Sequence, residues 1–226
     1  MYLTRMRLNT ARRGAVRLLG SPQSMHAAVM HGFPVEESAP RDGARTLWRL
    51  DRAERHDALL YVLSVTEPDL THLVEQAGWP TKPGGWETRP YSPLLDRLAT
   101  GQKWAFRLKA NPVRTARGPG QGHGERSRIV KEVTAAQQTA WLLRKAEDSG
   151  FSIPSGATGE PNLVLREREH LRFRREGSNR PVSLSVATFE GVLEVKDPGM
   201  MRRAMTAGIG RAKAYGCGLL TLAPAR

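Results

Sequence analysis

Along the first 98 residues, apolar residues recur either at every second position, as in a strand, or at the 3.6-residue spacing of a helix. These patterns predict elements in the order strand, helix, strand, strand, helix, strand. Residues 1–8 alternate apolar side chains with two arginines, which is typical of a strand. Ser21 and Pro22 precede an apolar helical pattern that ends at Gly32. The remaining elements are expected as strands at residues 46–50, 58–65 and 93–95 and as a helix at residues 68–77. The basic stretch at residues 9–20 is expected to form a loop.

The same order of elements recurs after residue 98. Strands are expected at residues 104–110, 162–175, 181–195 and 219–222, and helices at residues 133–148 and 198–207. Within residues 181–195 the apolar positions change parity after Val186, which predicts a β-bulge near residues 187–191. We therefore expect an α+β protein of two tandem ferredoxin-like βαββαβ domains, residues 1–98 and residues 99–226.

The charge of the chain is large and unevenly placed. A formal net charge of +13 and a pI near 10.8 make a polyanion the expected partner. Residues 1–98 carry 13 Lys and Arg against 11 Asp and Glu, whereas residues 99–226 carry 22 against 11. An acidic membrane surface is the competing polyanion, but no apolar run approaches the length of a spanning helix. We therefore expect a nucleic acid bound mainly by the C-terminal half, and no membrane.

Cysteine use and motif content narrow the class of protein further. The single cysteine, Cys217, excludes an intramolecular disulfide, and no signal peptide is recognised, so the cytoplasm is the expected compartment. No Cys/His cluster or paired-carboxylate motif marks a metal site, and no cofactor is expected. A basic DNA-binding protein is one alternative, but the sequence has no helix-turn-helix or zinc-ligand spacing to support it.

Four glycines and two cations lie between an expected helix and the last strand. They are Gly208, Gly210, Arg211, Lys213, Gly216 and Gly218. Glycine is required where φ is positive or where a ligand approaches the backbone closely, so this stretch predicts a surface that accepts a phosphate chain. It is neither a Walker nor a Rossmann loop. A helix C-cap followed by a tight turn is the alternative interpretation, and the two cations favour the anion site.

Residues 111–131 are expected to form a basic loop. Its cations are Arg114, Arg117, Arg126, Arg128 and Lys131. Glu125 is the only acid within this loop, and five glycine or proline residues lie between positions 118 and 124. Such a charge run is usually a solvated loop, but its place in the basic half favours a nucleic-acid clamp. Lys131 is the candidate cation that stabilises developing charge at a scissile phosphate.

A third basic feature follows the period of a strand. Arg166, Arg168, His170, Arg172 and Arg174 occupy even positions of the strand expected at residues 162–175. Period two places them on one face, with apolar residues on the other. Pairing with Glu167 and Glu169 is the alternative, but these acids have the opposite parity. The cationic face suits RNA, whose duplexes are recognised largely by shape and phosphate contact.

The stretch from Gly208 to Pro224 resembles the C-terminal glycine-rich signature of the CasE family, the endoribonucleases that cleave CRISPR repeat RNA in type I-E systems. Four further stretches agree with this family, at residues 1–3, 25–34, 106–112 and 131–145. The resemblance extends over most of the chain and implies the same two ferredoxin-like domains.

By this resemblance, the chain would be a metal-independent endoribonuclease that cuts at the base of a repeat stem-loop. It would leave a 2′,3′-cyclic phosphate and keep the product as a subunit of the type I-E surveillance complex. His26 lies where CasE-like enzymes have their catalytic histidine, and histidine can pass a proton near neutral pH. Several relatives have a tyrosine three residues earlier, where this chain has Gln23, so the second proton carrier is not identified.

Without the resemblance, His26 would have a simpler interpretation. A histidine on a short helix is more often a structural or surface residue than a catalyst. The alternative function is therefore a non-catalytic RNA-binding subunit of the same kind of complex, in which His26 is structural.

Overall fold

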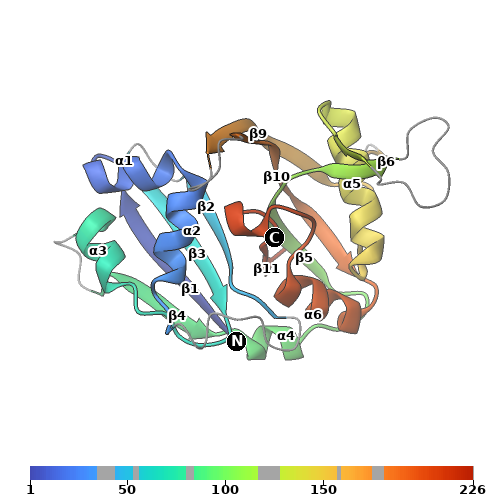
Figure 1. Cartoon of the computed structure of the whole chain (residues 1–226). Helices are drawn as coiled ribbons and strands as arrows, with labels where there is room; N and C mark the ends of the chain where they lie inside the picture. The colour runs from blue at the N-terminus through green and yellow to red at the C-terminus, as the bar shows by residue number, and fades with distance from the viewer. Residues whose placement is uncertain are drawn as a thin grey trace.

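Two antiparallel sheets lie side by side, one from each half of the chain, with helices packed on them (Figure 1). The computed structural model describes residues 1–34, 44–52, 56–79, 84–116, 128–156, 159–174 and 181–225. Both halves have the element order of a ferredoxin-like unit, so the predicted fold class is confirmed. The boundary between residues 98 and 99 stays a prediction.

The N-terminal sheet has the strand order β2-β3-β1-β4. This half contains β1 (Tyr2–Asn9), α1 (Arg13–Leu19), α2 (Pro22–Met30), β2 (Leu47–Arg52), β3 (Asp57–Ser64), α3 (Thr71–Ala77) and β4 (Trp86–Pro90). The central strand β1 pairs antiparallel with both β3 and β4. Strand β2 is an edge strand of this sheet, and it faces the C-terminal half.

Two predictions in this half are wrong. The strand expected at residues 93–95 lies within α4 (Ser92–Asp96), where Pro93 occupies the first turn, a position at which proline is tolerated. The strand that completes the sheet is β4, and its Trp86 lies opposite Met6. The loop expected at residues 9–20 contains α1, because Ala15 and Leu18 are buried in the apolar core beneath the helices.

The C-terminal sheet has the strand order β11-β5-β10-β8, and β9 also pairs with β10. This half contains β5 (Lys103–Ala110), α5 (Ala135–Asp148), β8 (Phe151–Ser152), β9 (Leu163–Arg174), β10 (Pro181–Val195), α6 (Pro198–Ala207) and β11 (Leu220–Pro224). The register of β9 on β10 shifts between Thr188 and Phe189, which confirms the predicted bulge.

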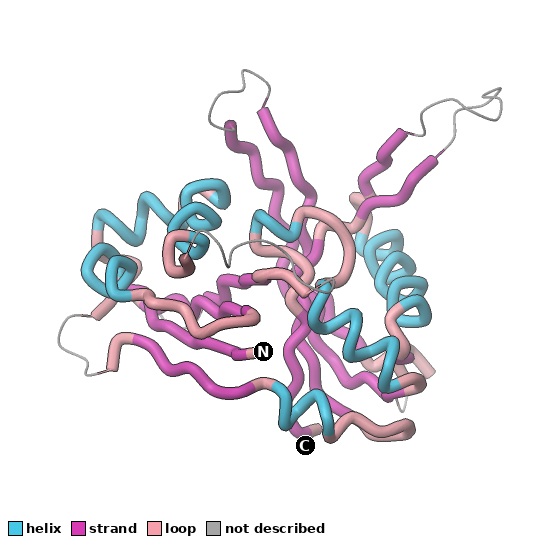
Figure 2. The backbone as a smooth tube through the Cα atoms, turned by 60° about the horizontal axis from the view of Figure 1, so that its bottom comes forward, coloured by secondary structure: helices cyan, strands magenta, loops and turns pink. Residues whose placement is uncertain are grey.

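Residues 111–131 are only partly the predicted loop. Strands β6 (Val113–Ala116) and β7 (Arg128–Lys131) pair as a hairpin, and a hydrogen bond from Glu132 N to Pro112 O (3.0 Å) closes its base. Residues 117–127 lie outside the described residues. The β6–β7 and β9–β10 hairpins project from the same side of the C-terminal half (Figure 2).

A buried arginine joins the two sheets. Arg49 on β2 is 2% exposed, and its Nε and Nη2 donate to the two carboxylate oxygens of Asp51 at 2.8 and 2.9 Å. Its Nη1 donates to the carbonyl oxygens of Arg107 on β5 and of Leu219 before β11, at 2.9 and 3.0 Å. A buried charge is tolerated only where ion-pair and hydrogen-bond partners satisfy it, as they do here. Arg49 therefore fixes the edge strand β2 against the C-terminal half.

Replacing Arg49 by alanine should lower the free energy of unfolding by about 3–5 kcal/mol, because Asp51 loses its bidentate partner and two carbonyl oxygens lose their donor. Urea denaturation measures this loss. Arg52→Ala is the control, since the Arg52 side chain on the same strand is 84% exposed, and its effect should stay within about 0.5 kcal/mol. Equal effects of the two variants would contradict the role given to Arg49.

Candidate active site

His26 lies on α2, which starts where the sequence provides a cap. The Ser21 hydroxyl accepts a hydrogen bond from Ser24 N at 3.2 Å, and a proline follows the cap. Met25 and Val29 are fully buried and hold the apolar face of α2 against the core. His26 lies on the flank of that face and is half-buried.

The buried indole of Trp48 on β2 holds the His26 ring. Trp48 Nε1 donates to His26 Nδ1 at 3.3 Å, which orients the ring through that nitrogen. Partial burial lowers the pKa of His26 below its ordinary value of 6.5, because the charged ring loses solvation. Gln23 lies one turn earlier on the same helix.

The glycine-rich stretch packs against the same tryptophan. Gly208, Gly210, Gly216 and Gly218 all have positive φ values, between 77° and 93°. A Cβ on Gly216 would lie 2.6 Å from the Trp48 ring, and a Cβ on Gly210 would lie 3.0 Å from the Trp141 ring. The predicted close approach is present, but at these two glycines it is made by protein side chains. Phosphate contact by the four glycines stays a prediction.

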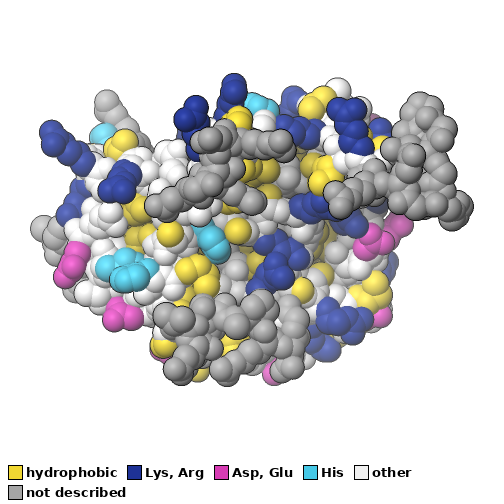
Figure 3. All heavy atoms as spheres, viewed as in Figure 1, with side chains coloured by type: hydrophobic (Ala, Val, Ile, Leu, Met, Phe, Trp, Pro, Cys, Tyr) yellow, Lys and Arg dark blue, Asp and Glu magenta, His cyan; other side chains and the backbone are white. Residues whose placement is uncertain are grey.

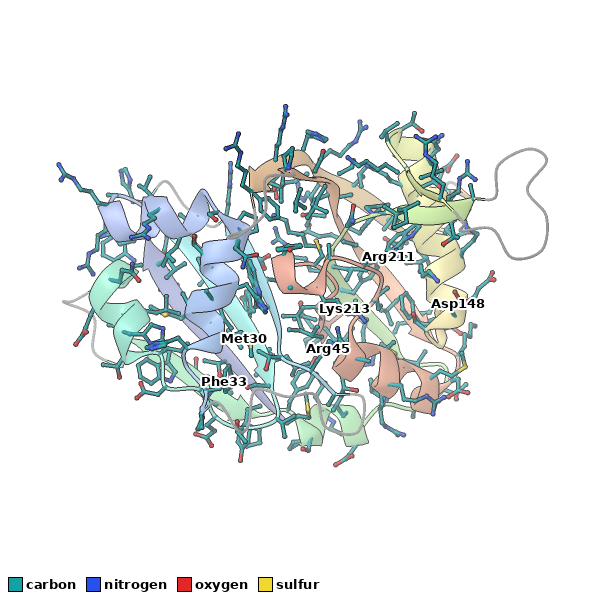
Figure 4. All side chains as sticks on the ribbon, viewed as in Figure 1. Met30, Phe33, Arg45, Asp148, Arg211 and Lys213 are labelled. Atoms are coloured by element: carbon teal, nitrogen blue, oxygen red, sulfur yellow. The ribbon has the colours of Figure 1, made fainter. Side chains whose placement is uncertain are left out.

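This packing brings the short 3-10 turn η2 (Lys213–Tyr215) against α2. Figure 4 shows Lys213 beside Arg45, in the region between α2 and α6. Lys213 is half-buried, and its pKa is lowered by burial and, secondly, by the positive charge of Arg45. Arg211 is exposed, and its backbone forms a β-bridge with Asn111.

Lys131 lies in a different part of the molecule. Its Nζ on β7 donates to Ser183 Oγ at 2.9 Å, and that hydroxyl lies 3.0 Å from His170 Nε2. Figure 1 shows the β6–β7 hairpin and α2 on opposite sides of the molecule. The structure therefore does not bring Lys131 together with His26, and the catalytic role of Lys131 stays a prediction.

The remaining cations of the predicted basic loop differ in their surroundings. Arg114 pairs with Glu132 at 3.3 Å, and Arg128 is exposed. Arg117 and Arg126 lie outside the described residues.

The cationic face predicted for β9 is present. Every even position from 164 to 174 is exposed and every odd position from 163 to 173 is half-buried. Arg166 pairs with Glu190 at 2.8 Å, and Arg168 donates to Gln138 Oε1 at 3.2 Å and to the Val133 carbonyl. Arg172 and Arg174 form no ion pair within the described ranges. On the face in Figure 3, Lys and Arg side chains line the upper edge and the middle of the molecule.

Sequence reasoning missed two residues of this site, Trp48 and Arg45. Trp48 has the pattern of an ordinary core residue of a strand, and Arg45 belongs to no motif. Each meets its partner only through the packing of distant segments, so no local signal marks either residue.

Two kinds of feature are absent among the residues that the structure describes. No helix there has the length and apolar character required to cross a membrane. No group of three or more His, Cys, Asp or Glu side chains is placed to hold a metal ion.

Comparison with known proteins covers nearly the whole chain. A family model described as "CRISPR associated protein" matches residues 1–224. The chain is 33% identical to the CRISPR-associated endoribonuclease Cse3 of Thermus thermophilus, over 99% of this chain and 100% of the relative. It is 29% identical to the CRISPR system Cascade subunit CasE of Escherichia coli, over 88% of this chain and 90% of the relative.

A solved structure agrees with this similarity. Cse3 of Thermus thermophilus, bound to an RNA representing a pre-cleavage complex, superposes with a TM-score of 0.79 at 32% identity. The match covers 99% of this chain and 98% of the solved chain.

Proposed function

This chain belongs to the CasE family of CRISPR-associated proteins, and we propose that it is an endoribonuclease that cleaves CRISPR repeat stem-loop RNA. The observation that carries the proposal is the position of His26. Trp48 orients its ring, the glycine-rich stretch packs on the same indole, and the turn η2 that carries Lys213 lies against the same helix. The similarity to Cse3 over the full chain supports the same activity.

The reaction needs only groups that the protein and the RNA supply. The 2′-oxygen attacks the adjacent phosphorus as its proton leaves, and the bond from phosphorus to the 5′-oxygen breaks as that oxygen gains a proton. The products are a 2′,3′-cyclic phosphate and a free 5′-hydroxyl. His26 Nε2 transfers one of these protons, as general base or general acid. No metal ion is required in this scheme.

The projecting hairpins supply the RNA-binding surface in this proposal. Arg172 and Arg174 are exposed at the end of β9, in a hairpin that projects from the C-terminal half (Figure 2), where the phosphates of an RNA stem can meet them. The protein then keeps the cleaved crRNA as a subunit of the type I-E surveillance complex, which the similarity to the Cascade subunit CasE supports. The single cysteine favours the cytoplasm as the place of this work.

One observation favours a second candidate function. Gln23 occupies the position three residues before His26 and has no hydroxyl to donate a proton. A chain that lacked a second proton carrier would be a non-catalytic RNA-binding subunit of the same complex.

His26→Ala should slow single-turnover cleavage of the cognate repeat RNA by about 10²–10⁴-fold, because it removes a proton-transfer group. Affinity for the repeat hairpin should change little, since the basic surfaces are intact. His56→Ala is the matched control, because His56 is exposed at the turn between β2 and β3. If the wild-type protein binds the repeat without cutting it, the non-catalytic function is correct.

The same assay in EDTA tests the metal-independent scheme. Cleavage should survive chelation, and a 2′-deoxy nucleotide before the scissile bond should block cutting while preserving binding. Loss of activity in EDTA that Mg²⁺ restores would exclude the scheme.

The pH dependence of kcat/KM, which reports the groups of the RNA-free protein, should reflect the lowered pKa of His26. Because burial disfavours the charged ring, the half-maximal kcat/KM should occur below pH 6.5. If the ring accepts the 2′-hydroxyl proton, kcat/KM falls as the pH drops through this point. If the ring donates to the 5′-oxygen, kcat/KM falls as the pH rises through it. An inflection above pH 6.5 would show that another group titrates.

The double variant Arg172→Ala and Arg174→Ala should flatten the dependence of log affinity on log salt. Each lost phosphate contact reduces the slope by about 0.7–0.9, because fewer counterions are released. Arg166→Ala is the comparison, since Glu190 already pairs with Arg166, and its effect should be smaller. Filter binding at several salt concentrations measures the slopes. An unchanged slope for the double variant would place this edge away from the RNA.

A further inference from the structure

The aliphatic stem of the Lys213 side chain packs closely against two glycines. A Cβ on Gly208 would lie 3.3 Å from Lys213 Cδ, and a Cβ on Gly218 would lie 3.3 Å from Lys213 Cγ. These distances are tighter than ordinary van der Waals contacts, so a side chain at either position would press on the lysine stem. The glycine-rich stretch therefore directs Lys213 in addition to packing on Trp48.

The backbone before Lys213 is also constrained. Ala212 has φ 65°, the only positive value at a non-glycine position among the described residues. A left-handed conformation is unfavourable for a residue with a Cβ, so it persists only where the surroundings require it. Ala212 packs with the buried cluster that contains Tyr215 and Cys217. This contact holds the turn in the shape that presents Lys213.

Lys213 differs from the cations of β5 at the junction in having no acceptor. Lys109 pairs with Glu169 at 3.0 Å, and Arg107 pairs with Glu190 at 3.1 Å. Within the described part of the chain, the Lys213 ammonium has no hydrogen-bond or ion-pair partner, and the positive charge of Arg45 lowers its pKa further. Among the described residues neither Lys213 nor Arg45 has an acid partner, and two neighbouring cations of this kind form a site that an anion would complete.

The position of this site relates it to His26. Turn η2 lies against α2, and Trp48 contacts both the His26 ring and the backbone at Gly216. We propose that Lys213 is a further catalytic residue of the cleavage reaction, whose ammonium binds a non-bridging oxygen of the scissile phosphate. This inference rests on the proposed endoribonuclease function. It assigns to Lys213 the electrostatic role that the sequence suggested for Lys131, whose ammonium is bound to Ser183.

The chemistry of this role is electrostatic. As the 2′-oxygen adds to phosphorus, negative charge grows on the non-bridging oxygens, and a fixed ammonium stabilises it. No bond forms to the lysine, and the protons travel through His26 and a second carrier. Partial burial keeps water from screening the ammonium, which strengthens its interaction with the phosphate.

Lys213→Met tests the proposal, because methionine keeps an unbranched side chain packed against Gly208 and Gly218 and removes the charge. Single-turnover cleavage of the repeat RNA should slow by about 10²–10³-fold, the usual loss for one group that stabilises an oxyanion. RNA affinity should fall less than the rate, and Lys213→Arg should retain more activity than Lys213→Met. Lys196→Ala is the matched control, since Lys196 is an exposed lysine of the same half that pairs with Glu194.

A phosphorothioate at the scissile bond provides a readout that a structural role would not change. Sulfur in place of the contacted non-bridging oxygen should slow the wild-type protein more than Lys213→Met, for one of the two stereoisomers. The proposal is overturned if Lys213→Met cuts at the wild-type rate, if affinity falls as much as rate, or if both proteins show equal sulfur effects. A wild-type protein that does not cut would instead overturn the proposed function itself.

Discussion

Arg49 is a charge buried at the junction of two sheets, and the geometry of the candidate site depends on it. Its guanidinium binds Asp51 on its own strand and two carbonyl oxygens of the C-terminal half. Leu47, on the same strand, is buried among C-terminal residues that include Phe106 and Leu108. Polar and apolar contacts therefore hold β2 in one position. The same contacts cover the unpaired edge of this strand.

The glycine-rich stretch uses both faces of that strand. Successive side chains of β2 point to opposite sides, so Leu47 and Trp48 face different cores. A Cβ on Gly208 would lie 2.8 Å from Leu47 Cδ2, whereas a Cβ on Gly216 would lie 2.6 Å from the Trp48 ring. The stretch thus wraps around the edge strand and meets α2 on the far side. This wrapping places a turn of the C-terminal half beside a histidine of the N-terminal half.

The sequence predicts features that depend on neighbouring residues. Period two in β9 gave the exposed cations, and the parity change in β10 gave the bulge between Thr188 and Phe189. The sequence pattern does not predict α1, because this helix has only seven residues and two buried side chains. Tertiary packing of those two side chains stabilises it despite its basic composition. The hydrogen bond from Trp48 to His26 and the approach of Arg45 to Lys213 arise only when both sheets are assembled. Periodicity carries no information on such contacts.

The cations at the junction of the two sheets differ in whether an acid pairs with them. Arg107 and Lys109 on β5 have acid partners, and these pairs stabilise the packing of the protein alone. Lys213 and Arg45 come from different halves of the chain, and their repulsion opposes close packing of the two segments that carry them. A phosphate between them would remove that repulsion. Binding of the RNA would then stabilise the junction in the same step that brings a phosphate toward His26, so substrate binding and completion of the site are coupled through one anion.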